Sequence, residues 1–238
     1  MVRQLVSLIA VLTMFAAPAE ANSNTGVLVV GGTGQLGAYH VQHLSKAGER
    51  VVVLARPTSS FKRLEGANYT VVVGDLRKAD EIMAAVVEAK PAVIVVASNF
   101  PGIRLEDGDA FYEPAMKALI VAAKAAGVTQ IIAHGVHTAR EALGTPLADA
   151  KITNYMRDSA RAEIALEQSG LTYTIVRNSG VPPEPAAPTG RGKLTAELSQ
   201  TGLITRSDLA RITNTCILNP ACYGQIYNGL DPEMPPRN

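Results

Sequence analysis

The stretch VLVVGGTGQLG, from Val27 to Gly37, decides the fold. Its first four residues are apolar and mostly β-branched, which predicts a short buried strand over 27–30. A glycine-rich run follows, and a helical pattern over 35–47 begins directly after it. The stretch therefore predicts a strand, a tight turn and a helix in immediate succession.

The glycines of this turn have the spacing G-x-G-x-x-G. Between a strand and a helix, the first glycine permits the bend, the second lets a phosphate approach the backbone, and the third lets the helix pack closely. The helix N-terminus adds free N–H groups that attract an anion. We expect a cradle for a dinucleotide pyrophosphate, with a ligand-free turn as the alternative. Its residues are Gly31, Gly32, Thr33, Gly34, Gln35, Leu36 and Gly37.

Apolar runs and alanine-rich helical stretches alternate along the rest of the chain. The predicted strands are 27–30, 51–55, 69–73, 92–97, 130–133 and 172–176, and the predicted helices are 35–47, 80–90, 111–126 and 150–168. The strands lack in–out alternation, as expected of parallel strands that are covered on both faces. The sequence therefore predicts an α/β fold, a doubly wound parallel Rossmann sheet with helices on both faces.

The pattern changes after the sixth strand. Residues 178–206 are rich in proline and glycine and predict a lid or substrate loop within a small C-terminal segment. Ser207 and Asp208 then cap a last helix that runs through Leu218, and 225–228 adds an edge strand. We expect one dinucleotide-binding domain over 22–238.

The N-terminus has the three-part layout of a secretory signal peptide over 1–21. The expected location is periplasmic or secreted, and cytoplasmic if the signal is not used. No second segment is long and apolar enough to cross a membrane, so no membrane contact is expected after cleavage. In an oxidising compartment Cys216 and Cys222 are a disulfide candidate, with two buried thiols as the alternative. Asn219-Pro220 predicts a turn that brings them together, so we predict the bridge.

Composition limits the partners. The formal net charge of +1, without a charged block, gives nucleic-acid binding little electrostatic support. His134 and His137 form H-x-x-H without a third ligand nearby, so no metal is expected. We expect a small-molecule substrate and a monomer or homodimer.

Arg56 follows the second predicted strand, where an acidic residue would hold the ribose 2′-hydroxyl of NAD. An arginine there favours a 2′-phosphate, and Lys62 and Arg63 lie just beyond it. We therefore expect NADP, with NAD less favoured. The alternative is a solvated surface arginine.

Four stretches make the chain resemble a known family: VVGGTGQLG, VVVGDLRKAD, AAKAAGVTQII and ARAEIALEQSGLTYTIVR. With RSDLARITN and GQIYN near the end, it resembles the atypical short-chain dehydrogenase/reductases of the NmrA-like, NAD(P)H-binding type. The resemblance covers nearly all of 27–229. It implies that Asp75 and Leu76 lie beside the adenine, and that Ala97 and Ser98 flank the nicotinamide-side ribose.

The usual catalytic pair of this superfamily, Tyr-x3-Lys, is missing. When AEIALEQSGLTYTIVR anchors the comparison, Arg161 takes the lysine position and Arg157 the tyrosine position. Arg161 is still expected to hold the ribose or a phosphate, but an arginine is a poor switchable base.

Two side chains remain candidates for catalysis. Tyr155 has Lys151 one helical turn before it, a reversed Tyr–Lys pair, unless both are simply helix surface. His134 is expected at a strand's carboxyl end, where it would donate a hydrogen bond to nicotinamide or substrate, unless it is an ordinary loop histidine. His40 and His43 are expected on the solvated face of the first helix.

Three functions follow from these features. The leading hypothesis is an NADP(H)-dependent oxidoreductase that reduces a small carbonyl, quinone or flavin-like acceptor. A non-catalytic NADP-binding sensor or regulator is the second, favoured by the missing Tyr-x3-Lys pair. An epimerase-like isomerase is the third, and the short C-terminal segment argues against it.

Overall fold

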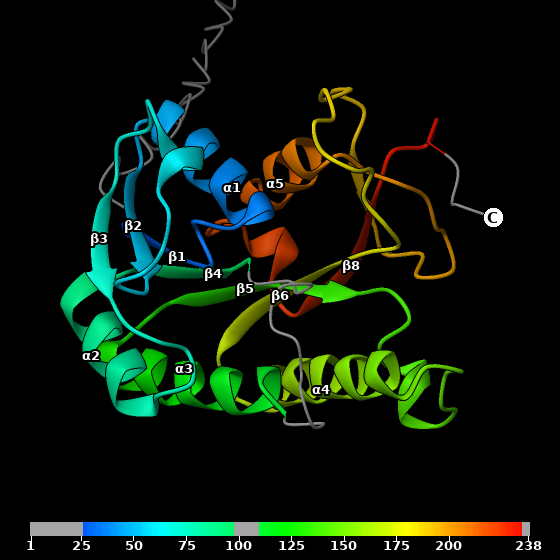
Figure 1. The fold of residues 1–238 in the computed structure, drawn as a ribbon, viewed down its shortest axis with the longest axis horizontal. Helices are drawn as coiled ribbons and strands as arrows, with labels where there is room; N and C mark the ends of the chain where they lie inside the picture. The colour runs from blue at the N-terminus through cyan, green and yellow to red at the C-terminus, as the bar shows by residue number, and fades with distance from the viewer. Residues whose placement is uncertain (1–25, 98–109, 235–238) are drawn as a thin grey trace, which may run out of the picture.

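The computed structural model describes residues 26–97 and 110–234, which surround one eight-stranded sheet (Figure 1). The strand order is β3-β2-β1-β4-β5-β6-β8-β7. All neighbours are parallel except β7 and β8. The strands are β1 (Gly26–Val30), β2 (Arg50–Ala55), β3 (Thr70–Val73), β4 (Val93–Val96), β5 (Gln130–Val136), β6 (Thr172–Asn178), β7 (Lys193–Thr195) and β8 (Gln225–Leu230).

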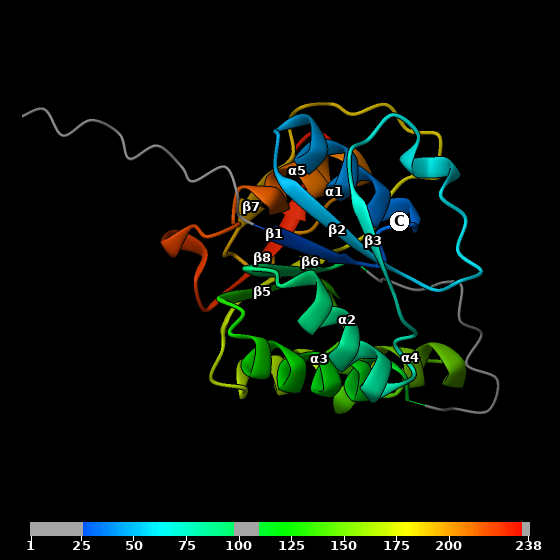
Figure 2. The same cartoon turned by 90° about the vertical axis from the view of Figure 1, so that its left-hand side faces the viewer.

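Helices cover both faces of this sheet. Figures 1 and 2 show α1 and α5 on one face and α2, α3 and α4 on the other. This confirms the predicted doubly wound architecture. The helices are α1 (Gln35–Lys46), α2 (Ala79–Ala89), α3 (Tyr112–Ala126), α4 (Ala150–Glu167) and α5 (Arg206–Asn214). Short 3₁₀ turns are η1 (Lys62–Leu64), η3 (Glu141–Leu143) and η4 (Pro220–Cys222).

The central strands are buried on both sides, which explains why their sequences do not alternate. Leu28 and Ile94 pack into the apolar layer under α2, α3 and α4. Their chain neighbours Val29 and Val95 pack into the opposite layer, under α1 and α5. Apolar side chains are therefore required at every position of β1 and β4.

The connection after β3 sets the place of the functional site. β2 and β3 lie on one side of β1, and the chain then crosses over through α2 to β4 on the other side. Connections leave β1 and β4 in opposite directions at their carboxyl ends, which opens a crevice there. The glycine-rich turn that follows β1 lies at this crevice.

The C-terminal part differs from the prediction in three respects. The last helix was predicted to be capped by Ser207 and Asp208 and to run through Leu218, but α5 follows its N-cap Thr205 and ends at Asn214. The predicted edge strand 225–228 is β8, which lies between β6 and the true edge strand β7. β7 falls within the segment 178–206 predicted as a loop, and its three residues, Lys193–Thr195, are too few to give a periodic signal. The segment is also anchored, because the backbone N–H groups of Thr189 and Gly190 donate to Asp208 at 2.7 and 3.0 Å.

The predicted disulfide is confirmed. Cys216 and Cys222 are joined, and their α-carbons are 5.4 Å apart. The chain reverses between them at η4, where the Asn219 side chain accepts a hydrogen bond from the Ala221 N–H at 3.1 Å. The turn predicted from Asn219-Pro220 thus brings the two cysteines together.

Residues 1–21, predicted as a signal peptide, lie outside the described residues, as does Ser98. Within 26–97 and 110–234, none of the helices has the length and apolar character needed to cross a bilayer.

Candidate functional site

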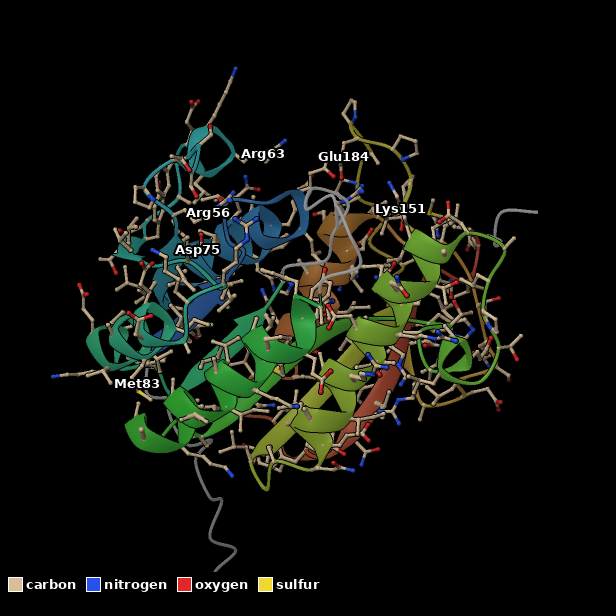
Figure 3. All side chains as sticks on the ribbon, turned by 60° about the horizontal axis from the view of Figure 1, so that its bottom comes forward. Arg56, Arg63, Asp75, Met83, Lys151 and Glu184 are labelled. Carbon is tan, nitrogen blue, oxygen red and sulfur yellow. A yellow bond between two sulfur atoms is a disulfide. The ribbon has the colours of Figure 1, made fainter. Side chains whose placement is uncertain are left out.

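A pocket of about 830 Å³ lies at the carboxyl ends of the parallel strands. Its volume falls within the roughly 300–1,000 Å³ typical of small-molecule sites. Residues after β2 and β3 line one end, the glycine-rich turn lines the middle, and residues after β4, β5 and β6 line the other end. Figure 3 shows Arg56, Arg63 and Asp75 together on one side, with Glu184 and Lys151 on the other.

The structure brings together most of the residues predicted to bind a cofactor. Those in the pocket lining are Gly31, Thr33, Gly34, Gln35, Leu36, Arg56, Asp75, Leu76 and Ala97. Gly32 and Gly37 are buried beneath the turn.

The glycines of the turn have separate physical roles. Gly31 has a φ of +79°, and the Gly34 N–H donates to its carbonyl oxygen at 2.9 Å. A β-carbon on Gly37 would lie 2.1 Å from that oxygen, so only glycine lets α1 begin so close to the strand. At Gly34 the nearest atom to an added β-carbon is 3.1 Å away. Gly34 is exposed and borders the pocket, so a side chain there would project into the ligand's space.

The start of α1 suits an anion. Its N-cap is Gly34, which has no side chain to bond the first N–H groups, and no acidic residue occurs in the first turn. Without such a cap, the first N–H groups of the helix remain free to donate hydrogen bonds to an anion, and the helix dipole also favours a negative charge there. The turn therefore fits a pyrophosphate both in shape and in charge.

The β2–β3 end of the pocket is rich in arginine. Arg56, Arg63 and Arg77 line it, and Asp75 is the acidic residue among the described residues of the lining. Ser59 joins this group, and its hydroxyl accepts a hydrogen bond from the Arg56 N–H at 3.1 Å. Lys62, expected to assist, is exposed on η1 and does not belong to the lining.

Tyr155 lies at the opposite end, as expected of a residue that meets the substrate. Its ring is 5.8 Å from that of Tyr112. Burial raises the pKa of Tyr155, and a hydrogen bond with Tyr112 offsets part of that shift. The phenol is therefore protonated at neutral pH. Lys151 is exposed and outside the pocket lining, so the reversed Tyr–Lys pair is not assembled there.

The expectation for Arg161 is wrong. Arg161 is exposed and lines a separate shallow hollow with Glu113 and Lys117, between the outer faces of α3 and α4. Arg157 is also outside the pocket lining, and its Nε donates to the carbonyl oxygen of Ala142 at 2.7 Å. The face of α4 that carries Arg161 points away from the crevice, so the family's lysine position is not reproduced.

His134 is not at the crevice edge either. The predicted strand stops at Ala133, but β5 continues to Val136, where it pairs with Asn178. His134 is thus an interior strand residue whose ring faces α1. Burial lowers its pKa well below the ordinary value, and the nearby His40 lowers it further.

The two histidines of α1 are not solvated as predicted. His40 is fully buried; its Nε2 lies 2.8 Å from His134 Nε2 and its Nδ1 2.6 Å from Asn214 Oδ1. Burial lowers the pKa of His40 to about 4. His43 is half-buried and bonds the Ser207 carbonyl oxygen at 3.1 Å. These contacts join α1 to β5 and α5.

A buried ion pair supports the rim beside the pocket. Glu163 of α4 accepts from Arg177 of β6 at 2.5 Å, and both side chains are less than a tenth exposed. Arg140 adds a second contact to Glu163 at 3.2 Å. Arg177 directly precedes the pocket residues Asn178 and Ser179. The pair therefore fixes the carboxyl end of β6.

Sequence reasoning missed several residues of the lining, above all Ser179 and Arg206. Arg206 begins the RSDLARITN stretch, and that stretch was identified only as a family feature. Topology offered the signal, because the segment after β6 must leave the sheet at the carboxyl edge, where ligands bind.

Comparisons with known proteins agree with this geometry. The model of a family described as NAD(P)H-binding matches residues 31–220. The chain is 26% identical over 234 residues to "Divinyl chlorophyllide a 8-vinyl-reductase, chloroplastic" of Cucumis sativus, covering 87% of this chain and 53% of that protein. The chain spans about half the length, or less, of the curated relatives it matches.

Solved structures share the fold. An anaerobillin reductase from Escherichia coli O157:H7 superposes with a TM-score of 0.73 at 24% identity, covering 90% of this chain and 100% of the other. A short-chain dehydrogenase/reductase from Veillonella parvula, in complex with NADP, has a TM-score of 0.67 at 15% identity, covering 88% and 96%. The family match, together with the glycine turn and the arginine-lined pocket, shows that the chain belongs to the NAD(P)H-binding family.

Proposed function

We propose that the protein is an NADPH-dependent reductase, and the observation that carries this proposal is Arg56. It follows β2, at the position where NAD-specific proteins of this fold carry an acid for the ribose 2′-hydroxyl. Arg63 and Ser59 line the same end of the pocket. Two guanidinium groups and a hydroxyl suit a 2′-phosphate, which arginine binds through paired N–H donors.

The remaining residues would position the rest of the cofactor. Gly34 and the N-terminus of α1 would hold the pyrophosphate, and Asp75 with Leu76 would border the adenine. β2 and β6 are four strand spacings apart in the sheet order, or about 19 Å. That span accommodates an extended dinucleotide with its nicotinamide toward Tyr155. When bound, the reduced nicotinamide supplies a hydride.

Tyr155 is the protein's candidate proton donor. Its raised pKa keeps the phenol protonated at neutral pH, so it can donate to an acceptor atom while the hydride adds to the neighbouring atom. One hydride and one proton together reduce one double bond. Without a lysine beside it the phenol is a weak acid, so solvent is the competing proton source.

The acceptor class follows from the pocket and the relatives. The acceptor end is bordered by the aromatic Tyr155 and Phe111 and the apolar Val136 and Val181, which suit a flat conjugated molecule. The cucumber relative is named for reduction of a vinyl group on a large conjugated ring. We therefore propose a conjugated acceptor: a quinone, a flavin-like ring, a conjugated carbonyl or a tetrapyrrole.

One observation favours the second function, a non-catalytic NADPH sensor. The family's two catalytic positions hold Arg157 and Arg161, and neither side chain lines the pocket. A sensor would bind NADPH with the same discrimination but would not turn it over.

The first experiment is a calorimetric titration of the protein with NADPH and NADH. Arg56→Asp is expected to weaken NADPH by about tenfold or more, with little effect on NADH, because a charge-assisted phosphate contact is lost and a repulsion replaces it. Lys62→Asp, a matched change on the exposed η1 turn, is the control and should preserve the preference. Equal loss of both cofactors in Arg56→Asp would contradict the assignment.

The second experiment separates reductase from sensor. NADPH oxidation is followed with benzoquinone, an aldehyde, a flavin and biliverdin as acceptors. Turnover that falls in Tyr155→Phe while NADPH affinity is retained supports the reductase with Tyr155 as donor. Tight NADPH binding without turnover of any of the four favours the sensor.

We also propose that the protein works outside the cytoplasm, in the periplasm or the medium. The Cys216–Cys222 disulfide supports this, since such bonds persist mainly in oxidising compartments. Mass spectrometry of the N-terminus of native protein tests it. Cleavage after Ala21 is the expected result, and an intact N-terminus in the cytoplasm is the contrary one.

A further inference from the structure

The pocket lining contains one more arginine besides those of its β2–β3 end. Arg206, the first residue of α5, lines the pocket beside the segment that follows β6. Among the described lining residues at the β6 end of the pocket, Arg206 is the one with a charged side chain. Arg206 contacts the segment that follows β6, whereas Arg56 and Arg63 follow β2.

Arg206 uses only part of its donor capacity. Its side chain is 16% exposed. Nη1 donates to the Pro182 carbonyl oxygen at 2.8 Å and lies 3.4 Å from Glu184 Oε1. Over the ranges that the structure describes, Nε and Nη2 have no partner. A guanidinium has five N–H donors, so this group retains a free edge.

Glu184 does not neutralise Arg206 closely. Its other oxygen, Oε2, accepts from the Tyr39 hydroxyl at 3.3 Å and from the Ala186 N–H at 3.0 Å. The contact with Arg206 is long for a charge-assisted hydrogen bond, which is usually shorter than about 3 Å. The carboxylate therefore orients the arginine through one nitrogen and leaves the rest of its charge available.

Ser179 provides an independent sign of a missing partner. Its Oγ is buried and has no hydrogen-bond partner among the residues that the structure describes, although Ser179 belongs to the pocket lining. Buried hydroxyl groups are normally paired, and an orphaned one indicates an absent ligand atom or water. Ser179 lies three residues before Pro182, on the segment directly after β6 that Arg206 binds, which we call the strap.

We propose that Arg206 and Ser179 form a subsite for a carboxylate group of the acceptor. Two free guanidinium nitrogens and a hydroxyl match a carboxylate, which accepts up to four hydrogen bonds. This deepens the proposed function and rests on it for the assignment of the acceptor end. The predicted substrate is a conjugated molecule with a carboxylate side group.

The test compares acids with their esters, so that charge is the only large difference between probes. Anthraquinone-2-carboxylate and its methyl ester form one pair, and biliverdin and its dimethyl ester form the other. Calorimetric or fluorescence titrations are performed on the full chain with and without NADPH. In at least one pair the acid is expected to bind about tenfold or more tightly than the ester.

Variants then assign the preference to the proposed residues. Arg206→Gln is expected to weaken the acid about tenfold and the ester less than about twofold, and Ser179→Ala to weaken the acid a few-fold. Arg211→Gln is the matched control: Arg211 lies on the same helix, bonds Gly190 and Asp208, and is outside the lining. It should retain the full acid preference.

Glu184→Gln keeps the proposal testable if Arg206→Gln does not fold. It removes the carboxylate that competes for Arg206, so affinity for the acid is expected to rise, and a fall would contradict the proposal. Equal binding of acid and ester, or no binding of either acid, overturns it. So does an Arg206→Gln variant that loses NADPH affinity and leaves acid affinity unchanged, since the anion would then be the cofactor's pyrophosphate.

These outcomes are separate from failure of the proposed function. If wild-type protein does not bind NADPH, the reductase assignment fails in the first titration. The preference for acid over ester is measured in the cofactor-free protein as well and is judged independently.

Discussion

The buried His40–His134 pair predicts that the protein loses stability in mild acid. His40 is fully buried and its pKa falls to about 4, whereas an unfolded histidine titrates near 6.5. Between these values the unfolded chain binds a proton that the folded protein cannot accept. Stability is therefore greatest above about pH 6.5 and is lost as the pH falls toward 4.

The size of the loss follows from the same two values. Integration of the proton-binding difference for His40 gives about 2 kcal/mol at pH 5 and about 3 kcal/mol below pH 4. His134 adds to the loss, because burial also lowers its pKa. For a domain whose total stability is typically about 5–15 kcal/mol, this is a substantial fraction.

Urea unfolding at about pH 7.5 and about pH 5, with unchanged m values, measures the effect. His40→Gln removes the titrating ring and is expected to be less stable near neutral pH but to lose about 2 kcal/mol less on acidification. His137→Gln, at a histidine that bonds Asn228 away from the pair, is the control and should keep the wild-type loss. If wild type and His40→Gln lose equal stability between the two pH values, the reasoning is refuted.

Three further predictions concern packing and the covalent link. Gly37→Ala should lower stability and abolish NADPH binding, because its β-carbon would lie 2.1 Å from a backbone oxygen. Gly34→Ala should lower NADPH affinity without lowering stability. Thermal melts measure the stability and calorimetry measures the affinity of both variants. Thiol titration of unfolded, unreduced protein should find neither Cys216 nor Cys222 free. Replacing both cysteines with serine should lower the free energy of unfolding by about 2 kcal/mol, a modest loss because the closed loop is short, and urea unfolding measures it. Glu163→Gln should cost about 3 kcal/mol in the same assay, because it leaves a buried guanidinium unpaired; a loss below 1 kcal/mol would show that the pair is not a structural support.

The sequence was sufficient for the fold where local pattern and tertiary role coincide. The run Val27–Val30 is apolar throughout because β1 is covered by helices on both faces. The glycine spacing was equally informative, since Gly37 has to pack against the backbone of the turn. Arg56 and Asp75 could be assigned because each directly follows a strand, and the carboxyl ends of parallel strands meet at one edge.

The errors share a physical cause, which is the direction in which a side chain points. Ending the fifth strand at Ala133 placed His134 in a loop; three more strand residues turn its ring toward α1. His40 is polar and lies on an amphipathic helix, so a solvated position was the natural expectation. Its burial depends on partners in β5 and α5, which are distant in sequence.

Arg161 and Arg206 illustrate the same limit. Arg161 was expected in the pocket but does not line it, whereas Arg206 was not expected there and does. Arg161 was expected to hold the ribose or a phosphate because it occupies a family's lysine position, but the register of α4 turns it to the opposite surface. Arg206 had no assigned role, yet it lies at the crevice because α5 begins where the strap after β6 returns to the sheet. A motif position predicts where a side chain points only if the helix has the same rotation about its axis as in the family. By contrast, residues that directly follow parallel strands lie at the carboxyl edge of the sheet whatever their identity. The proposed reduction is therefore to be sought among the lining residues that follow β5 and β6, which include Tyr155, Ser179 and Arg206, and not at the positions where the family keeps its tyrosine and lysine.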